Sequence, residues 1–171
     1  MSQTHPIDLG APVRRKERAI TDRAEIDAIL REGKVLHLAM SHANRPFLVP
    51  VFYAYDGGAL YLHSASQGTK IAILKENPYV CFEVSLNHGV IPDEKACDFE
   101  ARHRSAIGMG RVVFVEEREE KIRALDAIVA RFTDKKFEYP APALMAATVL
   151  RIEIESIKGK KHGASDEGFS L

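Results

Sequence analysis

The sequence predicts a mainly β protein with flanking helices, built as an antiparallel six-stranded barrel. Six segments alternate apolar and polar residues as strands do, and only three segments have helical periodicity. Most of the predicted strands follow one another through tight turns, whereas a doubly wound parallel sheet needs a helical crossover between successive strands. With 171 residues, 46% of them hydrophobic, the chain can bury one core. We expect one domain over residues 19–162, between an N-terminal arm (1–18) and a polar C-terminal tail (163–171).

Charge and apolar patterning argue against several classes of function. The 24 basic and 24 acidic residues balance to a formal net charge of zero, so no large positive field is available to bind a nucleic acid backbone. No apolar run approaches the roughly 20 residues that cross a bilayer, and residues 1–18 lack the apolar core of a signal peptide. We therefore expect a cytoplasmic protein with neither a nucleic acid nor a membrane as its partner.

The spacing of cysteines and histidines gives no support for a disulfide framework or a metal site. Cys81 lies in an apolar strand pattern and is predicted to be a small core residue, whereas Cys97 lies in a polar segment and is expected to be exposed. No pair of histidines shows helix spacing with a carboxylate, which a hydrolytic metal site would need. His37 is expected to pack within its strand.

The first half of the chain predicts one helix and three strands. Thr21 or Asp22 can begin a helix that Gly33 ends. A hairpin turn is expected at 56–58, where Asp is followed by two glycines. The three strands are predicted over residues 35–40, 47–55 and 59–64.

Pro50 interrupts the second of these strands. Because proline cannot donate a hydrogen bond to a strand ladder, it marks a bulge, a sheet edge, or a place where the backbone faces a ligand. The hairpin turn brings the segment 49–51 back toward the end of the next strand, which carries His63 and Ser64.

The second half of the chain predicts three more strands and a helix. The strands are expected over 79–86, 102–115 and 148–157, and the helix over 118–132. The segment 87–100 is predicted to be a loop, and its length favours a role in function or in an interface. A second loop is predicted over residues 133–147, which include two prolines.

Three residues within these strands call for a specific explanation. Gly108 and Gly110 lie on one face of an extended strand, which indicates close approach of another backbone, a ligand, or a tight bend of the barrel. Glu83 stands in an apolar strand, where pairing with an arginine such as Arg104 is the usual arrangement.

The stretch Tyr61–Lys70 is the first candidate site. It has the pattern of a strand end, a polar corner in which serines can cap a helix, and a short helix whose first turn holds Gly68, Thr69 and Lys70. A helix N-terminus has unpaired N–H groups and a partial positive charge, so it suits an anion, and phosphate fits these residue types. An ordinary capped helix with a solvated lysine is the alternative, which this stretch alone does not exclude.

An ordered set of motifs between Arg14 and His162 resembles a known family. The motifs are Arg14-Arg15-Lys16, Pro46-x-x-x-Pro50, Tyr55-Asp56-Gly57-Gly58, Tyr61-Leu62-His63-Ser64-Ala65-x-x-Gly68-x-Lys70, Asn77-Pro78-x-Val80-Cys81-Phe82-Glu83-Val84, Arg102-x-Arg104-Ser105-Ala106-Ile107-Gly108-x-Gly110 and Gly159-Lys160. In this order they resemble the nitroimidazole-resistance branch of the pyridoxamine 5′-phosphate oxidase-like flavoproteins. The resemblance implies a split β-barrel, a homodimer, and FMN bound in clefts at the dimer interface.

The resemblance also implies which residues hold FMN. It assigns the phosphate to the corner at Gly68, Thr69 and Lys70, and it places two residues of the preceding strand end along the ribityl chain and the flavin ring. The remaining cofactor-binding residues come from three other strands. The full predicted set is Val49, Pro50, Val51, His63, Ser64, Gly68, Thr69, Lys70, Arg104, Ser105, Lys158 and Lys160.

Two departures from the family pattern argue against pyridoxine phosphate oxidation. The oxidase proper has an arginine before the helix lysine, where this chain has Thr69. It also has C-terminal tryptophan and arginine positions, and this chain contains no tryptophan.

The first functional hypothesis is therefore an FMN-dependent oxidoreductase that reduces a small electrophile such as a nitroaromatic. No Gly-rich dinucleotide fingerprint is present, so a nicotinamide nucleotide that donates electrons would visit the flavin cleft. His63 is the candidate catalytic residue because histidine titrates near neutral pH, although a strand histidine is often only a structural hydrogen-bonding residue. The alternatives are a flavin- or haem-binding storage or sensing protein, with His63 or His162 as axial ligand, and a structural dimer with an empty cleft.

Overall fold

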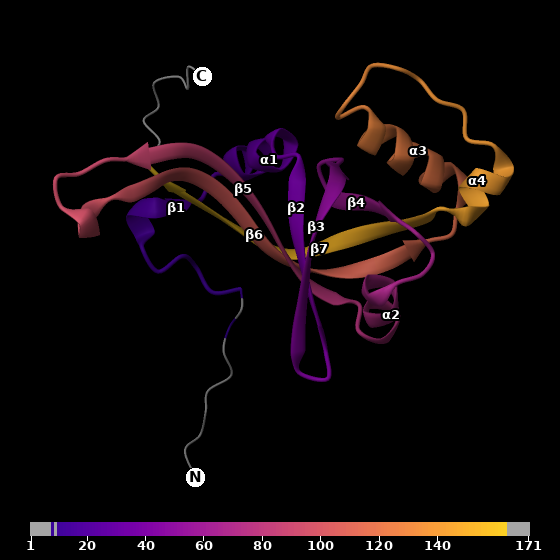
Figure 1. Ribbon diagram of the computed structural model, residues 1–171, viewed down its shortest axis with the longest axis horizontal. Coiled ribbons are helices and arrows are strands. Elements are labelled where there is room, and N and C mark those ends of the chain that lie inside the picture. Colours follow the sequence, from indigo (N-terminus) through magenta and orange to yellow (C-terminus); the bar gives the residue numbers. More distant parts are fainter. Residues whose placement is uncertain (1–7, 9, 164–171) are drawn as a thin grey trace, which may run out of the picture.

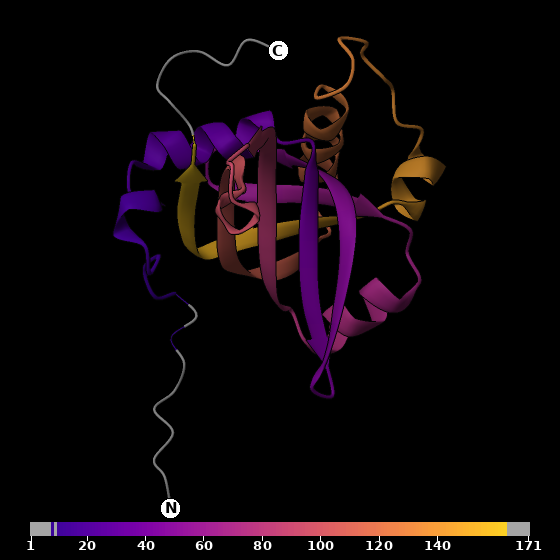
Figure 2. The same cartoon turned by 60° about the vertical axis from the view of Figure 1, so that its left-hand side comes forward.

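The computed structural model describes Asp8 and residues 10–163, so parts of the predicted arm and tail lie outside the described residues. Seven antiparallel strands form one sheet in the order β1-β7-β4-β3-β2-β5-β6, and pairing of β6 with β7 closes six of them into a barrel (Figures 1 and 2). The predicted antiparallel barrel of six strands is confirmed. The described residues contain no helix that is long and apolar enough to cross a membrane.

The strands alternate with a few short helices. The strands are β1 (Ala19–Ile20), β2 (Val35–His42), β3 (Arg45–Tyr55), β4 (Ala59–Ser64), β5 (Tyr79–Ile91), β6 (Glu100–Val115) and β7 (Thr148–His162). The α-helices are α1 (Arg23–Glu32), α2 (Thr69–Glu76), α3 (Arg118–Val129) and α4 (Ala141–Ala146), and the 3₁₀ turns are η1 (Lys16–Arg18) and η2 (Ala96–Asp98). The two-residue strand β1 was not predicted; it pairs with β7 through Ala19 and Lys160.

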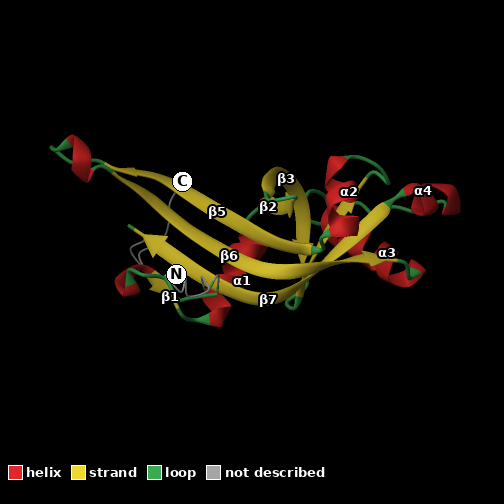
Figure 3. Cartoon of the chain, turned by 90° about the horizontal axis from the view of Figure 1, so that it is seen from below, coloured by secondary structure: helices red, strands yellow, loops and turns green. Residues whose placement is uncertain are grey.

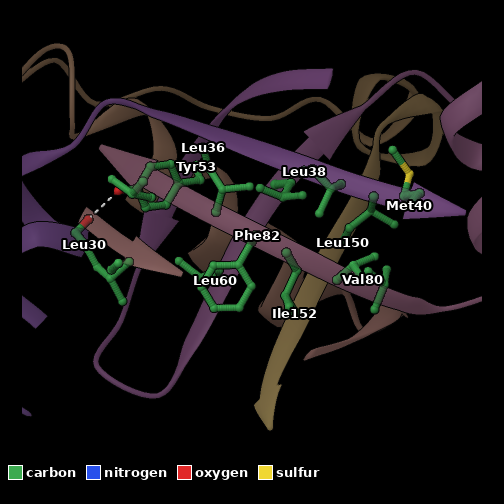
Figure 4. Close-up of a cluster of buried hydrophobic side chains, with 14 of the residues drawn as sticks. Leu30, Leu36, Leu38, Met40, Tyr53, Leu60, Val80, Phe82, Leu150 and Ile152 are labelled. Carbon is green, nitrogen blue, oxygen red and sulfur yellow. Dashed lines mark hydrogen bonds between the residues drawn. The ribbon is translucent and has the colours of Figure 1, made fainter. Parts of the chain in front are cut away.

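The core fills the barrel with large aliphatic and aromatic side chains. Leu38, Phe82 and Ile152 come from three different strands and are completely buried (Figure 4). The Tyr53 hydroxyl donates a hydrogen bond of 2.7 Å to the Leu30 carbonyl at the end of α1, and burial raises the pKa of Tyr53 to about 12. This bond satisfies a buried hydroxyl and ties α1 to the barrel.

The predicted loop over residues 87–100 is partly wrong, because β5 continues through its first five residues to Ile91 and β6 begins at Glu100. The register of β5 against β6 shifts between Asn87 and Val90, and Gly89 has a φ of +100°. Such a bulge absorbs residues that the alternation pattern cannot place, so pairing resumes beyond it. The resulting hairpin projects from the body of the barrel and carries η2 at its tip (Figure 3).

The predicted loop over residues 133–147 is also partly wrong, since it contains α4. Pro140 is the N-cap of this helix and Pro142 stands in its first turn. A proline needs no hydrogen-bond acceptor at those positions, so the two prolines start this helix instead of excluding one.

The barrel is split between β3 and β4. These strands pair only from Tyr53 to Tyr55, whereas the preceding segment 45–52 pairs with β2 alone within the described residues. Pro50 lies in this segment, so of the three predicted alternatives the sheet edge is the one that the structure shows. The proline places no demand for a hydrogen-bond acceptor on that free edge.

The two glycines of β6 meet the backbone of β7. A Cβ atom at Gly108 would lie 2.7 Å from the Ser156 carbonyl oxygen, and one at Gly110 would lie 2.5 Å from the Glu153 carbonyl oxygen. Of the predicted alternatives, close approach of another backbone is the one that the structure shows.

Candidate functional site

The corner between β4 and α2 leaves a helix N-terminus without a side-chain cap. The N-cap residue is Gly68, with a φ of +120°, and no side chain caps the helix. The prediction that serines cap this helix is therefore wrong: the positive φ, which only glycine adopts easily, lets the chain enter the helix without them. The N–H groups of the first turn remain available to a ligand.

Lys70 supplies a partly desolvated positive charge at this corner. Its side chain is half-buried, and burial lowers the pKa of the Lys70 ammonium group. No ion pair of Lys70 is present within the described residues. Because removing a charge from water without a counter-charge is unfavourable, this position favours an anionic ligand.

The end of β4 and the free edge of β3 provide the remaining groups near the corner. His63 and Ser64 are the last residues of β4 and stand opposite Val149 and Thr148 of β7. The His63 side chain is exposed, and nothing in the described part of the chain forms a hydrogen bond with it. Its imidazole can therefore contact a ligand directly.

The segment Val49–Val51 alternates between the two sides of β3. Val49 and Val51 pack against the core, and Pro50 is exposed on the outer face of the barrel. Only backbone groups at the strand edge and the Pro50 ring are therefore available to a ligand on that side. The role of this segment in binding a cofactor stays a prediction.

The other four predicted site residues lie far from the corner in the same chain. Arg104 forms an ion pair of 2.8 Å with Glu32 of α1, and Ser105 is buried with 7% of its surface exposed. The Lys158 ammonium donates to the Ala11 carbonyl oxygen at 2.9 Å. Lys160 stands twelve residues beyond Thr148 along β7, about 40 Å of extended strand. One chain therefore does not bring the two sets of predicted residues together.

The predicted pairing of Glu83 with Arg104 is wrong. The Glu83 carboxylate lies 3.0 Å from the Nδ1 atom of His37, which is exposed and not packed as predicted. The register decides this outcome, because Glu83 and His37 are direct cross-strand neighbours on β5 and β2. Arg104 stands on the opposite face of its strand, toward α1.

Strand register aligns one row of residues across the outer face of the barrel. The row is Pro50, His37, Glu83, Ile107 and Lys158, one residue from each of five adjacent strands. Leu48, Phe52 and Ile107 on this face expose 59%, 53% and 38% of their surface. Sequence reasoning missed this face because its residues come from separate segments that only the register brings together.

Cys81 also lies on the outer face, so its prediction as a core residue is wrong. It lines a small cavity of about 120 Å³ with Ile107, Met109 and Lys158. Partial burial raises the pKa of its thiol, which keeps the group protonated and unreactive at neutral pH. Cys97 is exposed, as predicted.

A comparison with protein families identifies the architecture. Residues 22–161 match the model of the pyridoxamine 5′-phosphate oxidase family. The chain belongs to this family. An uncharacterised protein from Rhizobium meliloti (strain 1021) is 30% identical over 66 residues, which are 39% of this chain and 43% of that protein. The match therefore spans less than half of that relative.

Solved structures agree with the split-barrel fold. A candidate 5-nitroimidazole antibiotic resistance protein from Bacteroides thetaiotaomicron is 32% identical, with a TM-score of 0.75 over 83% of this chain and 85% of that one. A flavocytochrome from Azotobacter vinelandii is 24% identical (TM-score 0.82; 94% and 78% covered). A protein from Mycobacterium smegmatis that binds FAD and haem is 20% identical (TM-score 0.79; 89% and 77% covered). The latter two likenesses concern the fold alone.

Replacing Lys70 by methionine tests whether this charge serves a ligand and not the fold. Because burial disfavours the ammonium, we expect flavin-free Lys70→Met protein to unfold at the same or a higher temperature than the parent. We expect its affinity for FMN to fall about tenfold or more, since a charge-assisted bond to phosphate is lost. Thermal unfolding and titration of FMN fluorescence measure the two effects.

Lys75→Met is the matched control, since it removes the same charge from an exposed position of α2. It should change the affinity for FMN by less than about twofold. A lower unfolding temperature together with unchanged FMN affinity in Lys70→Met would show that Lys70 stabilises the fold instead.

Proposed function

We propose that this protein is an FMN-dependent oxidoreductase that reduces a small electrophile, with nitroaromatic compounds as the substrate class. The observation that carries the proposal is the half-buried Lys70, without an ion pair in the described chain, beside a helix N-terminus without a side-chain cap. A phosphate dianion meets both features with charge-assisted hydrogen bonds. The family match and the likeness to the candidate nitroimidazole resistance protein support the same assignment.

The residues of the split fit an elongated ligand with a phosphate at one end. Gly68, Thr69 and Lys70 would hold the phosphate, while His63 and Ser64 would lie along the ribityl chain and ring. The free edge of β3 at residues 49–51 would face the ring, whose donors and acceptors suit backbone groups. The family resemblance supplies these roles, and the placement of the residues on β3, β4 and α2 supports them.

The chain's own task is then to bind and orient the flavin and to exclude water from it. When bound, FMN would supply the two-electron chemistry that links a donor such as a nicotinamide nucleotide to the acceptor. A nitro group that takes up two electrons and two protons becomes a nitroso group and releases water. The exposed His63 imidazole is the residue placed to supply one of these protons.

The absorption spectrum of the protein as purified tests the cofactor assignment. We expect a yellow protein with flavin bands, whose bound flavin is bleached by a nicotinamide nucleotide and regains its colour with a nitroaromatic acceptor. FMN at 100 times its dissociation constant should stabilise the flavin-free protein by about 2.7 kcal/mol. A Soret band would favour the haem-binding alternative. A colourless protein that neither quenches FMN fluorescence nor gains thermal stability from FMN would overturn the proposal.

Substitution of His63 separates proton transfer from cofactor binding. We expect His63→Gln to leave the FMN dissociation constant within about threefold, because glutamine keeps a hydrogen-bond donor. The rate at which reduced flavin transfers electrons to a nitroaromatic should fall about tenfold or more. Stopped-flow reoxidation measures this rate, with His42→Gln as control. Loss of FMN affinity with an unchanged reoxidation rate would assign His63 to binding only.

We also propose that a second copy of the chain completes the site. In the outer row, Pro50 and Lys158 stand at opposite ends, four strand spacings or about 19 Å apart. Two copies packed face to face, with a two-fold axis along the middle strand β5, would bring Lys158 of each copy over Pro50 of the other. The exposed apolar residues Leu48, Phe52 and Ile107 favour such packing.

Replacing Ile107 by arginine tests whether the outer face forms the proposed homodimer interface. An arginine at this position would have Glu83 as its cross-strand neighbour. We therefore expect each chain of the Ile107→Arg variant to fold normally. We expect the variant to sediment as a monomer and to bind FMN about tenfold or more weakly, although Ile107 lies outside the corner at α2. The control Met145→Arg changes a residue that is 83% exposed on α4 and should alter neither property. A parent protein that sediments as a monomer with FMN fully bound would exclude this interface.

A further inference from the structure

A hollow at the far end of the molecule from the α2 corner is lined almost entirely by cations. Its lining residues are Val13, Arg14, Arg15, Arg18 and Lys160, and its volume is about 400 Å³. No acidic residue lines it. This basic hollow is notable in a chain whose formal net charge is zero.

Backbone hydrogen bonds fix the positions of these cations. The N–H of Arg18 donates to the carbonyl oxygen of Arg15 at 3.0 Å, which closes the turn η1. Directly after this turn, Ala19 of β1 stands opposite Lys160 of β7. The turn therefore places Arg15 and Arg18 beside Lys160, which comes from the opposite end of the sequence. The backbone of the folded chain therefore brings the bases of these side chains together.

Most of the positive charge in the basic hollow has no internal counter-charge. Arg18 forms an ion pair of 2.7 Å with Glu100, whose carboxylate also contacts His162. The contact with Arg18, followed by that with His162, lowers the pKa of the Glu100 carboxyl. The ion pair also holds the Arg18 side chain in place. For Arg14, Arg15 and Lys160, by contrast, the described part of the chain provides no side-chain hydrogen bond or ion pair. At least three positive charges therefore face one another across the hollow.

We propose that the basic hollow binds the diphosphate group of a nicotinamide dinucleotide. Like charges held together repel, and a polyanion bound between them relieves this repulsion. The guanidinium group presents N–H donors in a planar fork that matches phosphate oxygens, so two arginines and a lysine suit a diphosphate better than a single carboxylate. The volume lies in the range of sites for small molecules, which fits a phosphorylated nucleotide.

The identification of this ligand as the electron donor rests on the proposed function. The basic hollow would then be the binding site of that donor. FMN has its own phosphate corner at Lys70, so the basic hollow is free for a second phosphorylated molecule. In the proposed dimer, the C-terminal end of β7, which carries Lys158 and Lys160, lies over the free β3 edge of the partner. A dinucleotide held by its diphosphate at this edge would then place its nicotinamide ring toward the partner's flavin.

Direct binding measurements test the basic hollow without relying on catalysis. Inorganic pyrophosphate and NADPH are titrated calorimetrically into FMN-saturated protein. If no flavin binds, the titration uses Lys70→Met protein, in which the α2 corner has lost its lysine. We expect Arg14→Ala/Arg15→Ala to weaken both ligands about tenfold or more at low salt. Both arginines are exposed and lack side-chain partners in the described chain, so the unfolding temperature should not change.

Lys135→Ala/Lys136→Ala is the matched control, because it removes two adjacent exposed charges from a distant loop. It should weaken binding less than about twofold. With bound flavin, the double arginine variant should also slow reduction by NADPH while reduction by dithionite keeps its rate. Equal affinities in the parent and both double variants, or no pyrophosphate binding by the parent, would overturn the inference. Failure of FMN to bind would overturn the proposed function alone, since pyrophosphate binding is measured independently.

Discussion

The architecture depends on one strand, β7, which pairs along both of its edges. Its first residues, 148–153, pair with β4, and residues 149–162 pair with β6. Over residues 149–153 the strand has partners on both sides, so this stretch leaves no free backbone edge, and Leu150 and Ile152 within it are completely buried. The strand has 15 residues, so it extends from the α2 corner to the basic hollow. The separation of the two sets of predicted site residues is a consequence of that length.

The split on the other side of the barrel supports our proposal of a flavin and not a haem. A free strand edge, an uncapped helix N-terminus and a half-buried ammonium demand a ligand with polar groups along its whole length. A haem needs an apolar cavity and an axial ligand. His162 is occupied by its contact with Glu100, and His63 lies at an exposed strand end. The chemistry of the split therefore favours the flavin, with its phosphate and its hydrogen-bonding ring.

Local patterns predicted most of the elements of the fold. Alternation located six strands, the hairpin turn located the β3–β4 connection, and Pro50 indicated the free edge. The errors have a different origin. The bulge at Gly89 and the α4 helix at Pro140 both arise from residues that end regular structure in most contexts, so periodicity alone predicted loops. Glu83 pairs with His37, and not with Arg104, because strand register determines cross-strand neighbours, and bulges shift that register.

The corner was easier to predict than the outer face for the same reason. Tyr61–Lys70 is continuous in sequence, so its residue types could be read together, whereas the outer row takes single residues from five strands. Even within the corner, the sequence favoured serine caps, which the positive φ of Gly68 makes unnecessary. A backbone conformation of this kind leaves no trace in hydrophobic periodicity.

The distribution of charge connects the two ends of the molecule. Several arginines at the surface of the barrel have acidic partners, namely Arg23 with Asp27, Arg104 with Glu32 and Arg151 with Glu120. Exposed pairs of this type contribute little to stability, but they cancel charge where no ligand is needed. At the α2 corner and in the basic hollow, by contrast, Lys70, Arg14, Arg15 and Lys160 have no ion pair within the described chain. Two copies related by a two-fold axis would turn these opposite ends into neighbours, so that one cleft receives a phosphate site from each chain. The unpaired cations at both ends of β7 would then suit the proposed binding of two phosphorylated molecules against each other.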